Sequence, residues 1–163
     1  NKETAVFSKA TLVLTKAEFD YVSDAAIKKL PEEIKKYYIP ANIAMKAYKG
    51  RIKTIKSGDT IIPGITSVDM AGHTAGSSGY MAESEGEKLF FAGDILHIES
   101  VQFTHPDYSL VYDGDPIKAA KIRSNTLKTL SENKIKSAGC HITFPGIFLA
   151  KNAKEGFSFS LVK

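Results

Sequence analysis

The sequence predicts a mixed α/β fold, and three observations lead to this prediction. A helix-rich segment covers residues 16–48, short β-rich runs follow between residues 51 and 92, and a further amphipathic helix begins near residue 115. The chain has 163 residues, of which 43% are hydrophobic and 25% charged, as is typical of a globular domain. We expect one domain, because a chain of this length is short for two.

The first segment is predicted to be helical from its capping signals. Thr15 and Glu18 have the spacing of a capping box, so a helix should begin here and run to about Leu30. Pro31 suits the first turn of a second helix, and Pro40 should break or kink that helix.

The β-rich runs begin after Gly50. Charged and apolar residues alternate from Arg51 to Lys56, which predicts a half-buried strand. Four more runs are predicted to be strands, and the last two should form a hairpin closed by residues 83–87; the runs are 61–62, 65–70, 79–82 and 88–92.

The C-terminal third is predicted to contain a loop, a helix and two strands. A long loop covers residues 98–114, and loops of this length in compact domains are often functional. Asp115 can cap a helix that has Pro116 in its first turn and continues to about Asn133. Strands are predicted at 137–140 and 157–162.

Composition argues against nucleic acid and membrane as partners. The net charge is +4, but the lysines are dispersed beside glutamates, and only Arg51 and Arg123 are arginines. No apolar run approaches the roughly 20 residues of a membrane helix. The chain begins at Asn1 rather than Met, so its localisation, bacterial periplasmic, secreted or cytoplasmic, stays open.

Three polar residues follow β-rich runs at the points where loops should begin. His73 lies in Ala-Gly-His-Thr, Asp94 in Phe-Ala-Gly-Asp, and His141 in Gly-Cys-His-Ile. Each alone is more typical of a structural turn residue. Together, two imidazoles and a carboxylate at strand ends can hold a divalent cation, so we predict a metal site.

The single cysteine, Cys140, adjoins His141 and excludes an intrachain disulfide. A thiolate ligand is one interpretation. A small buried side chain packed under the loop is the interpretation we favour from the sequence.

These motifs resemble the C-terminal part of a metallo-β-lactamase-fold hydrolase, and more narrowly the methyl parathion hydrolase branch. The matching stretches occur in order along almost the whole chain: Phe7–Thr11, Ser57–Thr60, Pro63–Thr66, Gly93–His97, Val101–Phe103, Tyr112–Pro116 and His141–Gly146.

The resemblance implies an αββα sandwich with a dinuclear metal site. His73 would bind one metal, His141 the other, and the catalytic Asp94 would bridge both. A metal-bound hydroxide would attack a small-molecule substrate, which would be an ester, lactone or phosphotriester. Two zinc ions per full-length chain are implied, with other divalent metals as alternatives.

The chain departs from the family pattern at two places. The His-x-His-x-Asp-His motif, which supplies most of the metal ligands, should precede Phe7 and is absent. Thr74–Ser77 stands where the family often has Thr-Pro-Gly-His. We therefore expect residues 1–163 to be a partial domain that lacks its N-terminal half, binds metal weakly and is inactive alone. Its uncovered apolar face should pair with a second copy, as a homodimer, or with the missing N-terminal fragment.

Three residues are candidates for the surroundings of the metals: His97, Phe103 and Tyr112. His97 matches the family and is either a support or pocket residue or a structural histidine. The loop aromatics either wall a substrate pocket or pack the loop onto the core. His105 is expected at the loop surface.

Two other functions are consistent with the sequence. One is a non-catalytic interaction module on the same scaffold. The other is a mononuclear iron dioxygenase of the same fold, which would use two histidines and one carboxylate.

Overall fold

The computed structural model describes residues 4–162. The chain divides between Lys56 and Ser57 into two compact units, each with its own sheet. Among the described residues, helices that are both long and apolar enough to cross a membrane are absent. The predicted mixed α/β fold is confirmed. The prediction of one partial domain also concerns residues outside this chain and stays a prediction.

The first unit is a parallel pair of strands joined through three helices. Parallel strands need a long crossover, which these helices provide. In chain order its elements are β1 (Leu12–Thr15), α1 (Lys16–Tyr21), α2 (Asp24–Ile27), α3 (Glu32–Ala47) and β2 (Ile52–Ile55).

The helical segment is divided differently from the prediction. Thr15 caps α1 as expected, since its hydroxyl accepts from the Glu18 amide at 3.1 Å. The prediction of one helix to about residue 30 is wrong, because Ser23 offers a second cap and accepts from the Ala26 amide at 3.2 Å. Pro40 does not break α3, which continues through it.

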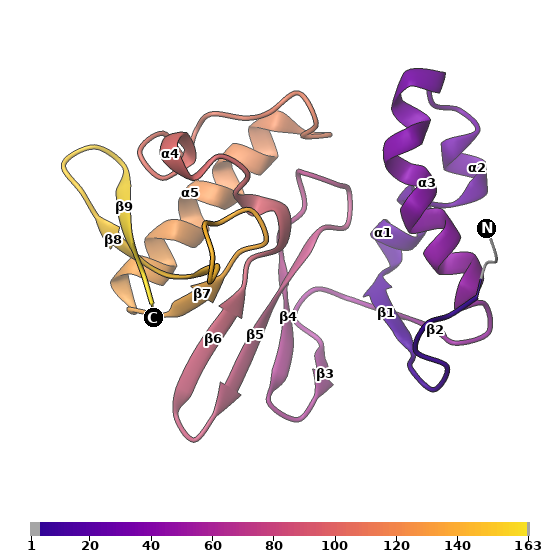
Figure 1. Cartoon of the computed structure of the whole chain (residues 1–163), viewed down its shortest axis with the longest axis horizontal. Helices are drawn as coiled ribbons and strands as arrows, with labels where there is room; N and C mark the ends of the chain where they lie inside the picture. The colour runs from indigo at the N-terminus through magenta and orange to yellow at the C-terminus, as the bar shows by residue number, and fades with distance from the viewer. Residues whose placement is uncertain (1–3, 163) are drawn as a thin grey trace. The chain divides into compact units, whose positions relative to one another are not determined.

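The second unit is a seven-stranded sheet in the order β3-β4-β5-β6-β7-β8-β9, with α5 (Pro116–Glu132) packed on it (Figure 1). Neighbouring strands are antiparallel except β6 and β7, which are parallel. β8 was not predicted from the sequence. The strands are β3 (Thr60–Ile62), β4 (Ile65–Asp69), β5 (Ser78–Ser84), β6 (Glu87–Phe91), β7 (Lys136–Ala138), β8 (Ile147–Asn152) and β9 (Phe157–Leu161).

Strand direction brings three loops to one edge of this sheet. β4 is antiparallel to β5 and β5 to β6, so β4 and β6 run the same way, and β7 is parallel to β6. The carboxyl ends of β4, β6 and β7 therefore lie at the same edge. The residues that follow these three strands are His73, Asp94 and His141 with their neighbours.

The predicted hairpin is confirmed, with longer strands and a tighter turn than expected. Glu83 pairs with Lys88 and Ser84 with Glu87, so only Glu85 and Gly86 form the turn. Their φ values are 52° and 81°, as a type I′ turn requires.

The core of the second unit lies between α5 and one face of the sheet. Leu127 and Leu130 of α5 are buried against Phe90 and Phe148 of the strands. The predicted apolar stripe of α5 is thus confirmed. The same helix also buries Arg123, which the sequence analysis did not place there.

The loop after β4 approaches α5 closely. Gly72 has φ 146°, and a Cβ at this position would lie 2.5 Å from the Ala119 amide nitrogen. Only glycine fits here without a shift of backbone, so Gly72 lets the His73 loop rest on the first turns of α5.

We predict that Leu127→Ala lowers the free energy of unfolding of the protein by about 2–5 kcal/mol, because it opens a cavity in a site that is 1% exposed. Urea denaturation measures the change. Ile117→Ala, on the same helix but 82% exposed, is the matched control and should shift stability by about 0.5 kcal/mol or less. Equal losses for both variants would contradict the packing described.

Candidate metal centre

The three strand-end residues predicted from the sequence converge. His73 lies in the loop after β4, Asp94 in the 3-10 helix η1 (Gly93–Ile95) after β6, and His141 in the loop after β7. The His73 Nε2 is 3.7 Å from Asp94 Oδ2, and the His141 Nε2 is 3.2 Å from Asp94 Oδ1. Asp94 therefore lies between the two histidines, with one carboxylate oxygen toward each.

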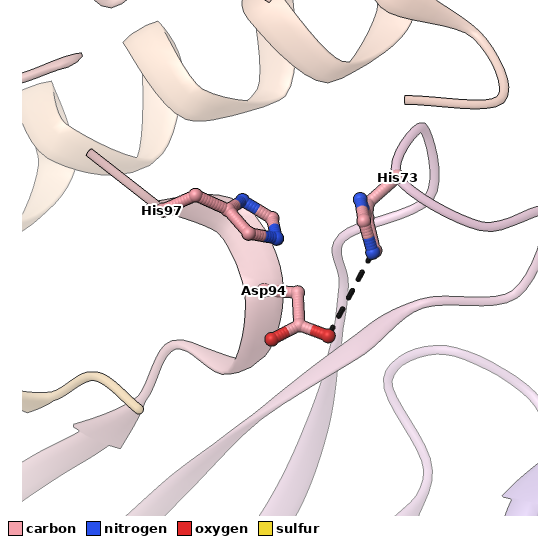
Figure 2. Close-up of side chains that lie close together, drawn as sticks. All are labelled: His73, Asp94 and His97. Atoms are coloured by element: carbon pink, nitrogen blue, oxygen red, sulfur yellow. Dashed lines mark ion pairs between the residues drawn. The ribbon is translucent and has the colours of Figure 1, made fainter. Parts of the chain in front are cut away.

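His97 lies between the same two imidazoles. Its ring centroid is 4.7 Å from that of His73 and 4.6 Å from that of His141. Figure 2 shows the side chains of His73, Asp94 and His97 turned toward one another, and their ligand atoms lie within 4.8 Å of one another. The His97 Nδ1 is buried and lacks a hydrogen-bond partner among the described residues.

The position of Cys140 differs from the buried one predicted from the sequence. The side chain is exposed rather than packed under the loop. Its thiol lies 3.1 Å from Asp94 Oδ1, to which it donates, and it belongs to a second group of close ligand atoms with Asp94 and His141. The prediction of a buried side chain is wrong because Cys140 lies in the loop after β7, where its thiol faces Asp94.

The cluster shifts the pKa of its own members. Desolvation opposes ionisation of Asp94, but the Cys140 hydrogen bond and the three neighbouring imidazoles together lower the pKa of Asp94. Burial, and then repulsion from His73 and His141, lowers the pKa of His97. Both shifts favour a carboxylate and a neutral imidazole, which are the forms that bind cations.

A buried carboxylate holds the His73 ring through Nδ1, the nitrogen that does not face Asp94. His73 Nδ1 lies 3.1 Å from Asp113 Oδ1, and Asp113 Oδ2 lies 3.3 Å from a nitrogen of the buried Arg123. Neither Asp113 nor Arg123 was predicted from the sequence as part of the site. A signal existed, because Arg123 lies within the apolar stripe of α5, where a charged side chain needs a buried partner.

The loop after β6 folds back on itself through α4 (Glu99–Gln102). The Glu99 carboxylate accepts from the Thr143 amide at 2.8 Å and from its hydroxyl, which ties α4 to the loop of His141. The Gln102 side-chain oxygen accepts from the His97 amide at 2.8 Å. These contacts fix the backbone on both sides of the cluster.

The two aromatic candidates lie in different places. Phe103 is 2% exposed and stacks on Phe159 at 4.3 Å, so of its two interpretations the structure favours packing of the loop onto the core. Tyr112 is 60% exposed, with its ring centroid 6.5 Å from that of His97, and its pocket role stays a prediction. His105, expected at the surface, is half-buried and stacks on Tyr108.

The donor set fits a divalent cation. Imidazole and carboxylate together, with a thiol beside them, suit zinc and related metals. Two ligand atoms about 2.1 Å from a tetrahedral zinc lie about 3.4 Å apart, and the two histidine–carboxylate distances of 3.7 and 3.2 Å bracket that value.

The fold defined by this sheet, its α5 crossover and its edge loops is the metallo-β-lactamase-like α/β fold, and the structures most similar to the chain include hydrolases of that kind. Hydrolase AbOPH of the beta-lactamase superfamily is 31% identical over 100% of this chain and 58% of its own, with a TM-score of 0.86. AidC, a dizinc quorum-quenching lactonase, is 25% identical over 99% of this chain and 57% of its own, with a TM-score of 0.88.

A third structure, an N-acyl homoserine lactone hydrolase with product bound at its catalytic metal centre, shares the fold at 16% identity and a TM-score of 0.53. It is covered over 51% of its length, and this chain over 83%. The chain thus spans somewhat more than half the length of these structures. Protein-family models and curated proteins give no match.

We predict that Cys140 reacts slowly with iodoacetamide at neutral pH in the presence of a chelator. Desolvation and the nearby Asp94 charge raise the pKa of the Cys140 thiol to about 11, and only the thiolate reacts. The alkylation rate measured by mass spectrometry should therefore rise only as the pH approaches that value.

Asp94→Asn should move this pH profile to lower pH, because it removes the carboxylate charge beside the thiol. Cys140→Ser, which removes the single cysteine, is the control for labelling elsewhere. A profile that is the same with and without the Asp94 carboxylate would contradict the contact between the two side chains.

Proposed function

We propose that the protein to which this chain belongs is a divalent-metal-dependent hydrolase of esters, lactones or phosphotriesters. One observation carries the proposal: Asp94 lies between His73 and His141 at a single sheet edge, with one oxygen toward each. The similar structures support it, since they include a dizinc lactonase and a hydrolase of the beta-lactamase superfamily.

In this proposal each side chain of the cluster has its own role. His73 and His141 would each hold one cation through Nε2, and Asp94 would contact both. When bound, divalent cations lower the pKa of a coordinated water and stabilise negative charge in the transition state. His97, whose pKa is lowered by burial, would stay neutral beside the reacting groups and could accept or donate a proton.

Two zinc ions per full-length chain are the finer proposal, together with membership of the methyl parathion hydrolase-like branch. The dizinc lactonase supports the metal count, and the ordered matching stretches support the branch. Other divalent metals suit the same donors, because the cluster combines imidazole with carboxylate.

The sheet supports the proposal that a further part completes the domain. Phe90, Phe148 and Ala150 face the core, so the alternating residues of the same strands face the other way. They include the half-buried or exposed apolar side chains of Leu89, Phe91, Ile147 and Leu149. Tyr80 of β5 pairs with Phe91 and shares this face. We propose that an N-terminal portion, or a second copy of the chain, covers this face and that the chain alone does not turn over substrate.

We predict that Asp94→Ala in the full-length protein abolishes both metal retention and turnover, because both cation positions lose the carboxylate that they share. Elemental analysis after zinc loading and gel filtration should show little metal, and kcat/KM on a lactone, ester and phosphotriester panel should fall at least about 100-fold. His105→Ala, an imidazole outside the cluster, is the matched control. Substantial activity in the Asp94 variant would refute the bridging role.

The same measurement separates the other functions. His73, Asp94 and His97 also form a two-histidine, one-carboxylate group, which is the arrangement of non-haem iron oxygenases. One iron per chain with oxygen-dependent turnover would favour that function over hydrolysis. A full-length protein with neither metal nor turnover would favour an interaction module.

We predict that the 163-residue chain self-associates in solution, because an apolar sheet face of this kind rarely stays exposed. Sedimentation velocity should show a concentration-dependent dimer. Phe91→Lys, which places a charge on this face, should shift the protein toward monomer, whereas Lys53→Ala in the first unit should leave it unchanged. A compact monomer at all concentrations would count against the uncovered face.

A further inference from the structure

We propose that Asp113 and Arg123 form a buried positioning pair that fixes the His73 ring, so that its Nε2 is presented to the cluster as an acceptor of metal. The proposal rests on the proposed function, because it assigns a purpose to the second nitrogen of a candidate ligand. Asp113 contacts the cluster through His73 Nδ1, the nitrogen that does not face Asp94, and Arg123 acts through Asp113 and backbone carbonyls, so both are positioning residues.

The contacts of Asp113 leave it little freedom. One oxygen lies 3.1 Å from His73 Nδ1. The other accepts from the Leu110 amide at 3.0 Å and from Arg123 Nη2 at 3.3 Å. The Asp113 side chain is 0% exposed and that of Arg123 1%, so water does not compete for these bonds.

This arrangement selects one tautomer of His73. A carboxylate can only accept, so the nitrogen facing it must carry the hydrogen. With the proton on Nδ1, the lone pair of Nε2 is left on the side of Asp94. Histidines that bind metal commonly donate their other N–H in this way, which fixes both the tautomer and the ring orientation.

Arg123 connects this pair to the turn that carries Asp94. Its Nε donates to the Ile95 carbonyl at 2.6 Å, one residue after Asp94. Its Nη1 donates to the carbonyls of Pro106 and Tyr108 at 2.9 and 2.7 Å. One guanidinium therefore holds the His73 side, through Asp113, and the Asp94 side, through Ile95. Lysine could not reach all of these acceptors from one planar group.

Backbone bonds hold the Asp113 segment against the His73 loop. The Gly114 amide donates to the His73 carbonyl at 3.0 Å, and the Asp115 amide donates to the Gly72 carbonyl at 2.9 Å. Asp115 in turn caps α5, where Arg123 lies. The carboxylate of Asp113 is thus placed by the same short segment that begins the helix.

The stability of the fold does not by itself explain the buried ion pair of Asp113 and Arg123. Desolvation of two charges offsets much of their attraction, and well-packed apolar residues often serve as well. The polar contacts of Arg123 and Asp113 nevertheless all go to loops around the cluster or to each other. Because both residues hold the loops that surround the cluster, we assign them a role in positioning its ligands.

The first test reads the tautomer directly. Two-dimensional ¹⁵N–¹H spectra of imidazoles in the metal-free protein, at a pH where histidines are neutral, should show His73 with its hydrogen on Nδ1. The signal is assigned with His73→Gln. A hydrogen on Nε2 in the unaltered protein would overturn the proposal, whatever the variants do.

The second test uses Asp113→Asn, which keeps the shape but offers an amide. Its oxygen should turn to Arg123, and its NH₂ should then face His73 Nδ1 and favour the other tautomer. We expect the His73 hydrogen to move to Nε2 and the zinc affinity, measured by competition with a chelating dye, to fall about 10–100-fold. Asp107→Asn, an exposed aspartate of the same loop, is the matched control and should change neither.

Arg123→Lys provides a check if Asp113→Asn fails to fold. It should weaken zinc binding in the same direction while the His73 hydrogen stays on Nδ1, because Asp113 remains. Zinc binding that is unchanged in both variants would overturn the positioning role. Absence of zinc binding in the unaltered protein would instead refute the proposed function, and the tautomer measurement would still stand.

Discussion

The parallel pairing of β6 with β7 is the interaction on which the candidate centre depends. Leu89, Phe90 and Phe91 pair with residues 136–138 in the same direction, so the loop of His141 begins at the edge where Asp94 lies. An antiparallel pair would send His141 to the opposite edge of the sheet. Parallel strands cannot be joined by a short turn, and the crossover here contains α4 and α5. The burial of α5 against the sheet therefore supports the site, because it packs the crossover that joins β6 to β7 onto the same sheet.

The same helix joins the core to the cluster. Leu127 and Leu130 of α5 lie in the apolar core, and Arg123, one turn earlier, reaches the Ile95 carbonyl and Asp113. A shift of α5 along the sheet would move both ligand loops together. The Gly72 contact with Ala119 adds a third point at which the site rests on this helix. Core packing and site geometry are thus coupled through one helix. A core substitution in α5 should therefore displace His73 more than β3, which is an outermost strand of the sheet.

The sequence predicts those features that local chemistry decides. The caps at Thr15 and Asp115, the hairpin and the three strand-end residues each have a signal within a few positions. Features that depend on tertiary contacts escaped prediction. Nothing near Asp113 indicates that it meets His73, because 40 positions separate them. The exposure of Cys140 and the burial of Phe103 likewise follow from which side of a loop faces the sheet, and a residue type does not encode that. Ser23 differs from these residues, because its N-cap signal is local and the helical pattern on both sides of it hid that signal.

Charge sets a limit on what the cluster can hold. Asp94 is the one carboxylate among the grouped ligand atoms of the described residues. The nearby carboxylate of Asp113 is paired with Arg123, so its negative charge is already balanced. Two dications beside a single carboxylate and neutral imidazoles would leave a large uncompensated positive charge in a partly desolvated site, which is unfavourable at close range. One cation, bound by Asp94 and neutral imidazoles, creates far less of this repulsion. A second cation therefore requires further anionic ligands, whether from solvent, from substrate or from another part of the protein. The lowered pKa of His97 also limits the positive charge of the site, because a neutral imidazole offers a nitrogen ligand to a cation without adding charge of its own.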